Sequence, residues 1–450
     1  MTSGQYAFVP KFLQLSSMNI LANLMVPVAG LIDVAFLGHL ADLRHLAGVA
    51  IATILFNYIY WTFGFLRMGT TGMTAQAVGR GDQEEVLLVG LRNSLLAIFL
   101  GILILILQYP LRELGFNLLS ATASVKTSGL MFYNAMIWGA PATLLNFVLL
   151  GWFLGRSQGK QVILLSLVGS VANIGLDYLF IIKLGWESMG AGAATATSQY
   201  AMAVTGLILI AIDYSFSQRI FEKKSQIDPL KLLTKIWEPT ALQAAFNLNR
   251  AILLRTLLMV SSFSAFTNLG SGMGTIVLAT NTLLLQIVTL SAYLIDGIAF
   301  ATESFAGIFY GQAKMGKQDP QLLPLIWVGG GLSLGLGMAI ALLVALFPLP
   351  LFSLLTIHFE VVQQTPIYVL WLFPVLGFGS IAFMLDGYFI GLTAGNILLR
   401  SAFISSMLFT PVAILAWQQQ NPHLLWLALT LFMAGRVIPM VIAIPKTLAD

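Results

Sequence analysis

Acidic and amide residues interrupt the long apolar runs of this chain at positions where they could carry protons. Asp33 lies six residues after Pro27 in PVAGLIDVAFLGHL, and Asn173 and Asp177 lie four residues apart in VANIGLDYLFI. Residues four apart share one face of a helix, so this amide and this acid can line one polar cavity. Because burial disfavours the charged form of a carboxyl group, we predict that Asp33 and Asp177 take up and release protons.

The same residues also have purely structural interpretations. Asp33 precedes the polar segment GHLADLRH and is also explained as an acid at a helix end. Asn173 and Asp177 are also explained as partners in a hydrogen bond between helices. Thr197, in GAGAATATSQY, adds a hydroxyl to a run whose small residues equally suit packing. The candidate residues for proton or ion coupling are therefore Asp33, Asn173, Asp177 and Thr197.

A second polar group occurs in the later half of the chain. Asp296 and Glu303 are seven residues apart, two turns along one helix face, and Asp386 lies in FMLDGYFIGLT. Arg250 and Arg255 supply candidate counter-charges. An acid paired with arginine keeps its charge and holds no proton, so structural neutralisation is at least as good an interpretation as ion coupling.

Aromatic and amide side chains suggest where a planar organic compound could bind. The candidate residues for a substrate cavity are Tyr58, Trp61, Tyr133, Asn134 and Trp138. Aromatic residues in membrane segments also serve as lipid and packing contacts, which is the alternative interpretation.

The elements that carry these residues are predicted to be transmembrane helices. Of the 450 residues, 58% are hydrophobic and only 9% are charged, far from the composition of soluble proteins. Apolar runs long enough to cross a bilayer recur without the alternation typical of barrel strands. The predicted spans are 10–38, 46–78, 87–110, 122–154, 161–182, 189–213, 237–267, 274–311, 323–347, 361–392, 397–417 and 423–446.

The chain divides into two related halves. The segment LRMGTTGMTAQAVGRG at 66–81 resembles IAFATESFAGIFYGQA at 298–313, and each ends the second span of its half. We predict six-helix bundles at 1–214 and 236–450, joined by a polar connector at 215–235. Basic residues number twelve in the loops after even spans and four after odd spans, which predicts cytoplasmic termini.

Motifs for other functions are missing from the sequence. It contains no cysteine, no HExxH and no GxSxG, and GRSQGKQ lacks the spacing of a phosphate-binding loop. The net charge of +4 is explained by basic loops rather than by nucleic-acid binding. We therefore predict a monomeric membrane protein that is not an enzyme, with no cofactor and no metal, whose partners are a small-molecule substrate and membrane lipid.

The segments discussed above, taken in order, resemble the multidrug and toxic compound extrusion (MATE) family in its DinF-like branch. The matching segments are PVAGLIDVAFLGHL, APATLLNFVLLGWFLGRSQ, VANIGLDYLFI, GAGAATATSQY, NRAILLRTLL, DGIAFATESFAGIFYG and DGYFIGLTAGN. The resemblance implies a V-shaped pair of six-helix bundles that alternates between inward-open and outward-open states. It also implies that Asp33, Asn173, Asp177 and Thr197 respond to the coupling ion, whereas helix 7 carries Arg250 and Arg255 where other branches have an acid.

The functional hypothesis is an antiporter in the plasma (inner) membrane or an organelle envelope. It exports amphiphilic organic compounds, either drug-like cations or organic acids, in exchange for protons, with sodium as the alternative ion. Two other functions stay open on the sequence alone, a lipid or lipid-linked flippase of related architecture and an intramembrane enzyme.

Overall fold

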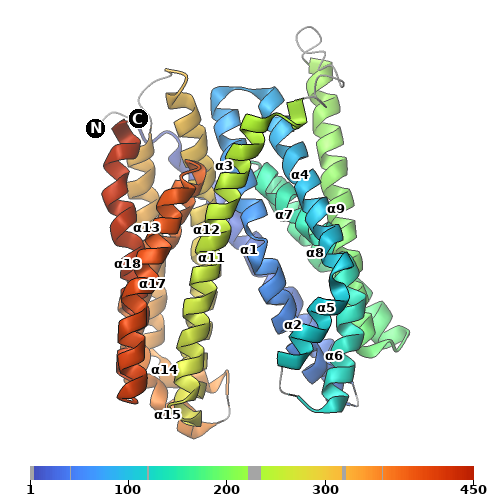
Figure 1. Ribbon diagram of the computed structural model, residues 1–450, viewed down its shortest axis with the longest axis vertical. Coiled ribbons are helices and arrows are strands. Elements are labelled where there is room, and N and C mark those ends of the chain that lie inside the picture. The colour runs from blue at the N-terminus through green and yellow to red at the C-terminus, as the bar shows by residue number, and fades with distance from the viewer. Residues whose placement is uncertain are drawn as a thin grey trace. The chain divides into compact units, whose positions relative to one another are not determined.

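The computed structural model describes residues 5–40, 42–118, 121–220, 235–316, 321–356 and 358–449, and nearly all of them are helical (Figure 1). These described residues contain no strand. The α-helices are α1 (Val9–Gly38), α2 (Arg44–Thr62), α3 (Phe65–Arg80), α4 (Gln83–Ile106), α5 (Gln108–Leu118), α6 (Ala123–Met136), α7 (Ala140–Gly155), α8 (Gly159–Asp177), α9 (Glu187–Ile220), α11 (Pro239–Ser271), α12 (Thr275–Ala313), α13 (Leu322–Leu346), α14 (Pro348–Ser353), α15 (Phe359–Tyr368), α16 (Leu372–Gly391), α17 (Gly395–Gln418) and α18 (Pro422–Ala449).

Twelve segments in the described part of the chain are long and apolar enough to cross a membrane. Some combine two helices: α2 and α3 form the second, and α6 and α7 form the fourth through a short 3-10 turn. The fifth span joins α8 to a π-helical turn at Tyr178–Lys183. The predicted all-α class and the predicted number of spans are confirmed.

Local chemistry sets where these helices begin and end. Gly81 follows α3 with φ at 75°, a left-handed conformation that glycine adopts without steric cost. The side chain of Asp82 then caps α4 by accepting a hydrogen bond of 3.0 Å from the backbone N–H of Glu85. Together these residues turn the chain sharply between the second and third spans.

Helix packing divides the chain into two compact units. The first unit is Leu21–Ala245, and the second is Phe246–Asp450 together with Met1–Ile20. The unit boundaries therefore fall inside α1 and α11. Residues 221–234 of the expected connector lie outside the described residues, so the boundaries 1–214, 215–235 and 236–450 stay a prediction.

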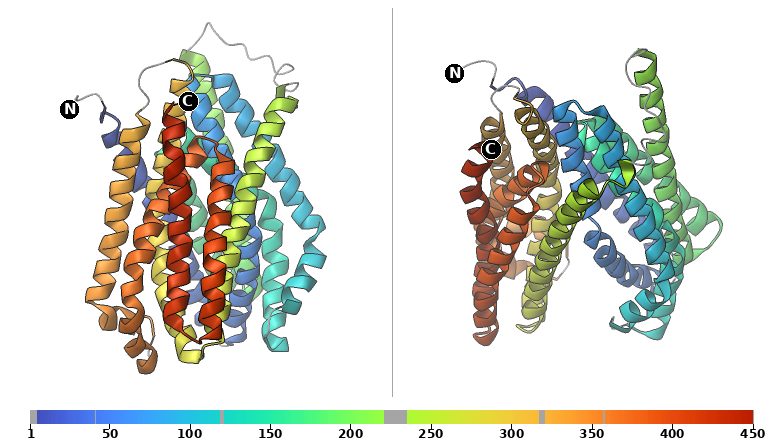
Figure 2. Two further views of the ribbon diagram at one scale, coloured as in Figure 1. Left: turned by 60° about the vertical axis from the view of Figure 1, so that its left-hand side comes forward. Right: turned by 45° about the horizontal axis from the view of Figure 1, so that its top comes forward.

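Each unit has its own pattern of neighbouring helices. In the first unit α7 packs against α3 and α4, and α9 packs against α6 and α8. In the second unit α16 packs against α12 and α13, while α17 and α18 lie side by side at the red end of the chain (Figures 1 and 2).

Paired glycines bring helix backbones together in the same way in both units. A Cβ on Gly151 or Gly155 of α7 would come within 2.4 and 2.7 Å of the carbonyl oxygens of Arg67 and Thr71 on α3. In the same way, a Cβ on Gly387 or Gly391 of α16 would come within 2.2 and 2.3 Å of the carbonyl oxygens of residues 299 and 303 on α12. Small residues four apart permit such close helix contacts in membranes. The motifs GWFLG and GYFIG therefore mark equivalent helices of an internal repeat.

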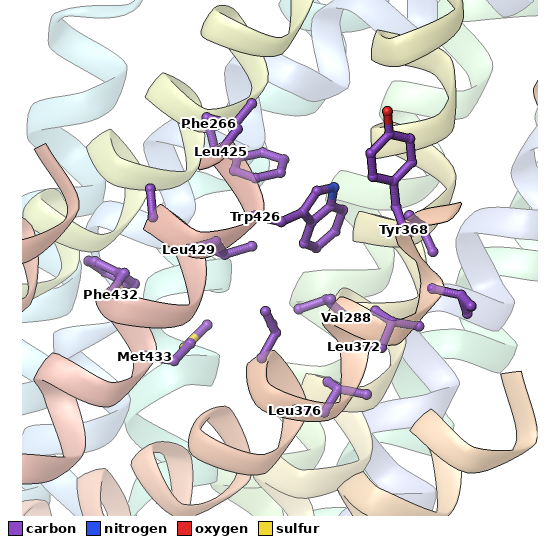
Figure 3. Packing of buried hydrophobic residues seen from close by; sticks show 14 of the residues in the cluster. Phe266, Val288, Tyr368, Leu372, Leu376, Leu425, Trp426, Leu429, Phe432 and Met433 are labelled. Carbon is purple, nitrogen blue, oxygen red and sulfur yellow. The ribbon is translucent and has the colours of Figure 1, made fainter. Parts of the chain in front are cut away.

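An aromatic core holds the helices of the second unit in place (Figure 3). Trp426 of α18 is fully buried, and its ring meets Phe266 of α11 edge to face at 5.1 Å. Its indole N–H donates to Asn281 Oδ1 of α12 at 2.9 Å, so the polar atom is satisfied as well. This contact joins α18, α11 and α12 and fixes the helix that carries Arg436.

Candidate functional site

Two acids meet in the first unit, Asp33 from α1 and Asp177 from the last turn of α8. Asp177 is fully buried and Asp33 is half-buried. Their carboxyl groups are close enough to interact electrostatically. Among the described residues, neither oxygen of Asp177 has a hydrogen-bond partner, and Oδ1 of Asp33 has none either. Because two neighbouring carboxylates repel each other, this placement favours a proton on one of the acids.

Asn173 lies on the same face of α8, one turn before Asp177, and is almost fully buried. Its Nδ2 donates to the hydroxyl of Thr195 on α9 at 3.4 Å, and that hydroxyl donates to the carbonyl of Ala191 at 3.0 Å. The cluster of Asp33, Asp177, Asn173 and Thr195 is called the acid pair cluster below.

Thr195 rather than Thr197 therefore stands beside Asn173. Two residues along a helix turn through about 200°, so the two threonines point to opposite sides of α9. Thr197 is exposed. The pattern that identifies Thr195 is that it shares a helix face with the buried Ala191 and Ser198, three or four residues away.

The fifth span changes its winding directly after Asp177. Residues Tyr178–Lys183 form a π-helix, in which the hydrogen bonds span one residue more than in an α-helix. Phe180 in this turn stacks on Trp186 with ring centres 4.9 Å apart. Such turns are frequent at functional sites, and here the turn lies next to the buried acid.

The second unit contains a buried acid with a different environment. Asp386 of α16 accepts hydrogen bonds at Oδ2 from both Arg255 of α11 and Arg436 of α18. All three side chains are buried, and the Arg436 guanidinium also lies 4.8 Å above the ring of Phe383. Asp386 is therefore held as an anion by two cations, and this group is called the arginine clamp below.

The other charged residues of the second unit lie at varying depths. Asp296 is half-buried on α12, close enough to Arg436 to interact electrostatically. Glu303 is buried on the same helix. Arg250 is exposed, because it stands five residues before Arg255 and therefore points to another side of α11. Asp386 thus has Arg255 and Arg436 as counter-charges, and Arg436 was not assigned this role from the sequence.

The aromatic candidates separate into buried and exposed groups. Tyr133 is buried, stacks on Phe56 with ring centres 5.2 Å apart, and donates to the carbonyl of Gln108 at 3.0 Å. Tyr58, Trp61 and Trp138 each expose about half of their surface in the first unit, where a ligand or lipid can contact them. Asn134 is also exposed and accepts a long hydrogen bond of 3.5 Å from Arg112.

A further buried arginine holds the chain that leads into α11. Arg92 of α4 donates to the carbonyls of Lys235 at 2.8 Å and Ile236 at 3.3 Å, and to the carboxylate of Glu85 at 2.8 Å. Arg92 is one of the twelve basic residues assigned above to the loops after even spans, but it lies inside α4. Within the described residues, no three histidine, cysteine or acidic side chains are grouped so that they could hold a metal ion.

Comparison with known proteins gives consistent results over most of the chain. A family model described as MatE matches residues 19–179 and 251–415. The chain is 32% identical over 423 residues to DNA damage-inducible protein F of Escherichia coli K12, covering 93% of this chain and 88% of that protein. It is 26% identical over 432 residues to protein DETOXIFICATION 44, chloroplastic, of Arabidopsis thaliana, covering 92% and 77%.

Solved structures share the fold. An outward-facing multidrug resistance MATE family transporter superposes with a TM-score of 0.83 at 20% identity, covering 100% of this chain and 99% of that one. A transporter of the MOP superfamily from Pyrococcus furiosus gives the same TM-score and coverage at 19% identity. At this level of identity the likeness concerns the fold alone.

Proposed function

Because the chain belongs to the MATE family of multidrug efflux transporters, we propose that it exports amphiphilic organic compounds in exchange for protons by alternating access. Membership of this family confirms the predictions of a multi-pass integral membrane protein and of a transporter that is not an enzyme. The coupling ion, the exchange reaction and the roles of individual residues are the content of the proposal.

The contact between Asp33 and Asp177 is the observation that carries the proposal. A proton shared between the buried Asp177 and the half-buried Asp33 neutralises one of them without a cation from the protein. Loss of that proton leaves two negative charges side by side in a poorly solvated place, which is costly. The acid pair cluster therefore has two protonation states of very different energy, and a transport cycle can be driven by the change between them.

Substrate and proton can compete for the acid pair cluster. A cationic or amphiphilic compound that approaches Asp33 supplies the positive charge that the proton otherwise supplies. We propose that Asp33 binds protons and substrate alternately, while Thr195 orients the amide of Asn173 on the helix face that also carries Asp177. Thr197 stays a candidate for contact with substrate, because its side chain is exposed.

The arginine clamp supports protons over sodium as the coupling ion. A sodium ion needs several oxygen ligands, and the charge of Asp386 is already balanced by Arg255 and Arg436. The second unit thus offers Asp386 to guanidinium groups rather than to a metal ion. A sodium ion at the acid pair cluster would compete with the shared proton.

The relatives support a broad range of organic substrates. Several related proteins are described as probable multidrug resistance proteins NorM, including one from Thermotoga maritima that is 23% identical over 361 residues. The surface aromatics Tyr58, Trp61 and Trp138 are suited to stacking on planar compounds. We further propose that the protein acts as a monomer with both termini in the cytoplasm.

Reconstitution into liposomes tests the proposal. The purified protein is exposed to an imposed proton gradient or an imposed sodium gradient, and uptake is measured for a panel of organic cations and organic acids. We expect transport with the proton gradient and none with sodium alone. Transport driven by sodium alone would overturn the proposed coupling ion.

A further inference from the structure

A small pocket lies at one end of the first unit, away from the acid pair cluster. Its volume is about 190 Å³, less than the roughly 300–1,000 Å³ of pockets for drug-sized ligands. The pocket is lined by Phe153, Gln158, Gln161, Leu209, Ile212 and Asp213. These residues come from the end of α7, the turn after it, the start of α8 and the later part of α9.

Two spans meet at this pocket, which indicates its depth in the membrane. The fourth span ends at Gly155 and the fifth begins at Gly159, while α9 passes the pocket and continues to Ile220. The ends of transmembrane helices lie at the level of lipid headgroups. The pocket is therefore in contact with the headgroup layer rather than with the hydrocarbon interior.

Asp213, which lines the pocket, forms an ion pair with Arg156 beside it. Arg156 Nη2 lies 2.6 Å from Asp213 Oδ2, and the guanidinium lies 4.3 Å above the ring of Trp152. The indole N–H of Trp152 is itself bonded to the carbonyl of Val86 at 2.8 Å. Asp213 therefore holds one edge of the guanidinium, and the ring of Trp152 covers one of its faces. The second terminal nitrogen, Nη1, has no hydrogen-bond partner among the described residues.

Two polar atoms near this ion pair are covered from solvent and lack a hydrogen-bond partner among the described residues. They are Nη1 of Arg156, which can only donate, and Oε1 of Gln158, which can only accept. Each such atom costs about 1–3 kcal/mol when it stays unpaired. An occupant that satisfies both must carry an acceptor and a donor close together.

We propose that this pocket binds the headgroup of a phospholipid that carries a phosphate and a primary ammonium, as phosphatidylethanolamine does. The phosphate accepts from Arg156 Nη1, and the ammonium donates to Gln158 Oε1 and to the carboxylate of Asp213. Because Arg156 and Asp213 balance each other, the pocket has no excess charge that would select a purely anionic headgroup.

The surface of α9 provides a path for the acyl chains. Val204, Leu207, Ile208 and Ile212 expose about half or more of their side chains along α9. Ile212 also lines the pocket, so this apolar strip continues from the pocket toward the middle of the span. A lipid is therefore a better fit than a free phosphate ester, which would leave the strip unused.

Lipid binding to the purified full-length protein in detergent tests this proposal. Native mass spectrometry compares phosphatidylethanolamine with phosphatidylcholine and phosphatidylglycerol of identical acyl chains. Phosphatidylcholine has no N–H to donate to Gln158, so we expect phosphatidylethanolamine to bind about tenfold more tightly, the effect of about one net hydrogen bond. Equal binding of the ethanolamine and choline lipids would overturn the proposal, as would tighter binding of phosphatidylglycerol.

Variants separate the pocket from other lipid contacts on the protein surface. Gln158→Leu is expected to remove the preference for phosphatidylethanolamine over phosphatidylcholine, whereas Arg156→Lys keeps the ion pair but weakens both lipids. Ile212→Trp blocks the pocket from its lipid-facing side and should have the same effect as Gln158→Leu without altering a polar group. The matched control Gln83→Leu changes an exposed glutamine at the start of α4 and should leave the preference intact.

Two results would contradict the assignment even in well-folded variants. A preference for phosphatidylethanolamine that survives both Gln158→Leu and Ile212→Trp would place its origin elsewhere on the protein. Displacement of the lipid by soluble glycerophosphoethanolamine at equal concentration would show that the acyl chains contribute nothing, which would overturn the assignment to a lipid.

Discussion

The two units each bury an acid among membrane helices, but they surround it with different groups. Asp177 meets another acid and lies one turn from an amide, whereas Asp386 meets two guanidinium groups. An acid that faces an acid needs a proton, and an acid that faces two arginines needs none. Burial alone therefore does not mark a proton-coupling residue, since the neighbouring charges decide whether a proton is held.

The two units nevertheless share the same close packing of two helices. The close contact of α7 with α3 repeats in the contact of α16 with α12, with glycines at equivalent places. Asp386 stands directly before the first glycine of GYFIG, and Leu150 stands directly before the first glycine of GWFLG. The repeat therefore places a charge in one unit and an apolar residue at the equivalent position in the other.

The largest expected effect is on the arginine clamp. Asp386→Asn removes the carboxylate that both guanidinium groups contact, so it should lower the free energy of unfolding by about 3–5 kcal/mol. Thermal unfolding in detergent measures this loss. The control Asp42→Asn breaks an exposed ion pair with Arg44 and should cost at most about 1 kcal/mol. A stable Asp386→Asn protein that no longer exchanges protons would reverse the roles of the two units.

Next in size is the effect of removing a proton carrier from the acid pair cluster. Asp33→Asn should reduce export driven by a pH gradient by about 5- to 150-fold, the usual range of coupling between two sites. Thermal stability should stay near that of the unaltered protein, because an amide N–H can donate to Asp177 in place of the shared proton. Vesicles that still export with an imposed pH gradient would show that Asp33 does not couple transport to protons.

A smaller effect is expected from the hydrogen bond between Asn173 and Thr195, one helix turn from Asp177. Asn173→Ala and Thr195→Ala should each cost about 0.5–1.5 kcal/mol of stability. The double variant should cost less than the sum, because both changes remove the same bond. Additive losses would mean that Asn173 and Thr195 act independently.

The smallest effects should come from Thr197→Ala and Arg250→Ala. Both side chains are exposed, so each change should alter stability by no more than about 0.5 kcal/mol. Thermal unfolding of these variants beside Thr195→Ala and Arg255→Ala gives the matched comparison. A large loss in Arg250→Ala would show that the clamp extends beyond Arg255 and Arg436.

The sequence was sufficient to predict the elements because apolar runs of bilayer length have one stable form in lipid. The spans predicted at 122–154 and 397–417, for example, agree with Ala123–Gly155 and Gly395–Gln418 to within a few residues. The shared face of Asn173 and Asp177 also follows directly from helical spacing.

The sequence was insufficient wherever a partner comes from a distant helix. Arg436 stands 50 residues after Asp386, and nothing in the spacing indicates that α18 brings its guanidinium to α16. Arg92 was sorted with the loops because of its charge, although backbone carbonyls near residue 235 satisfy it inside α4. The choice between Thr195 and Thr197 needed the orientation of α9, which depends on packing against other helices.

The π-helical turn that follows Asp177 contains an extra residue that the helix does not need for its length. A turn whose hydrogen bonds span one extra residue contains one residue more than an α-helix of the same rise requires. Deletion of a single residue within Tyr178–Lys183 would restore ordinary winding and leave the spacing of Asn173 and Asp177 unchanged. The acid and its amide neighbour would thus keep their register in a chain that lacks the extra residue.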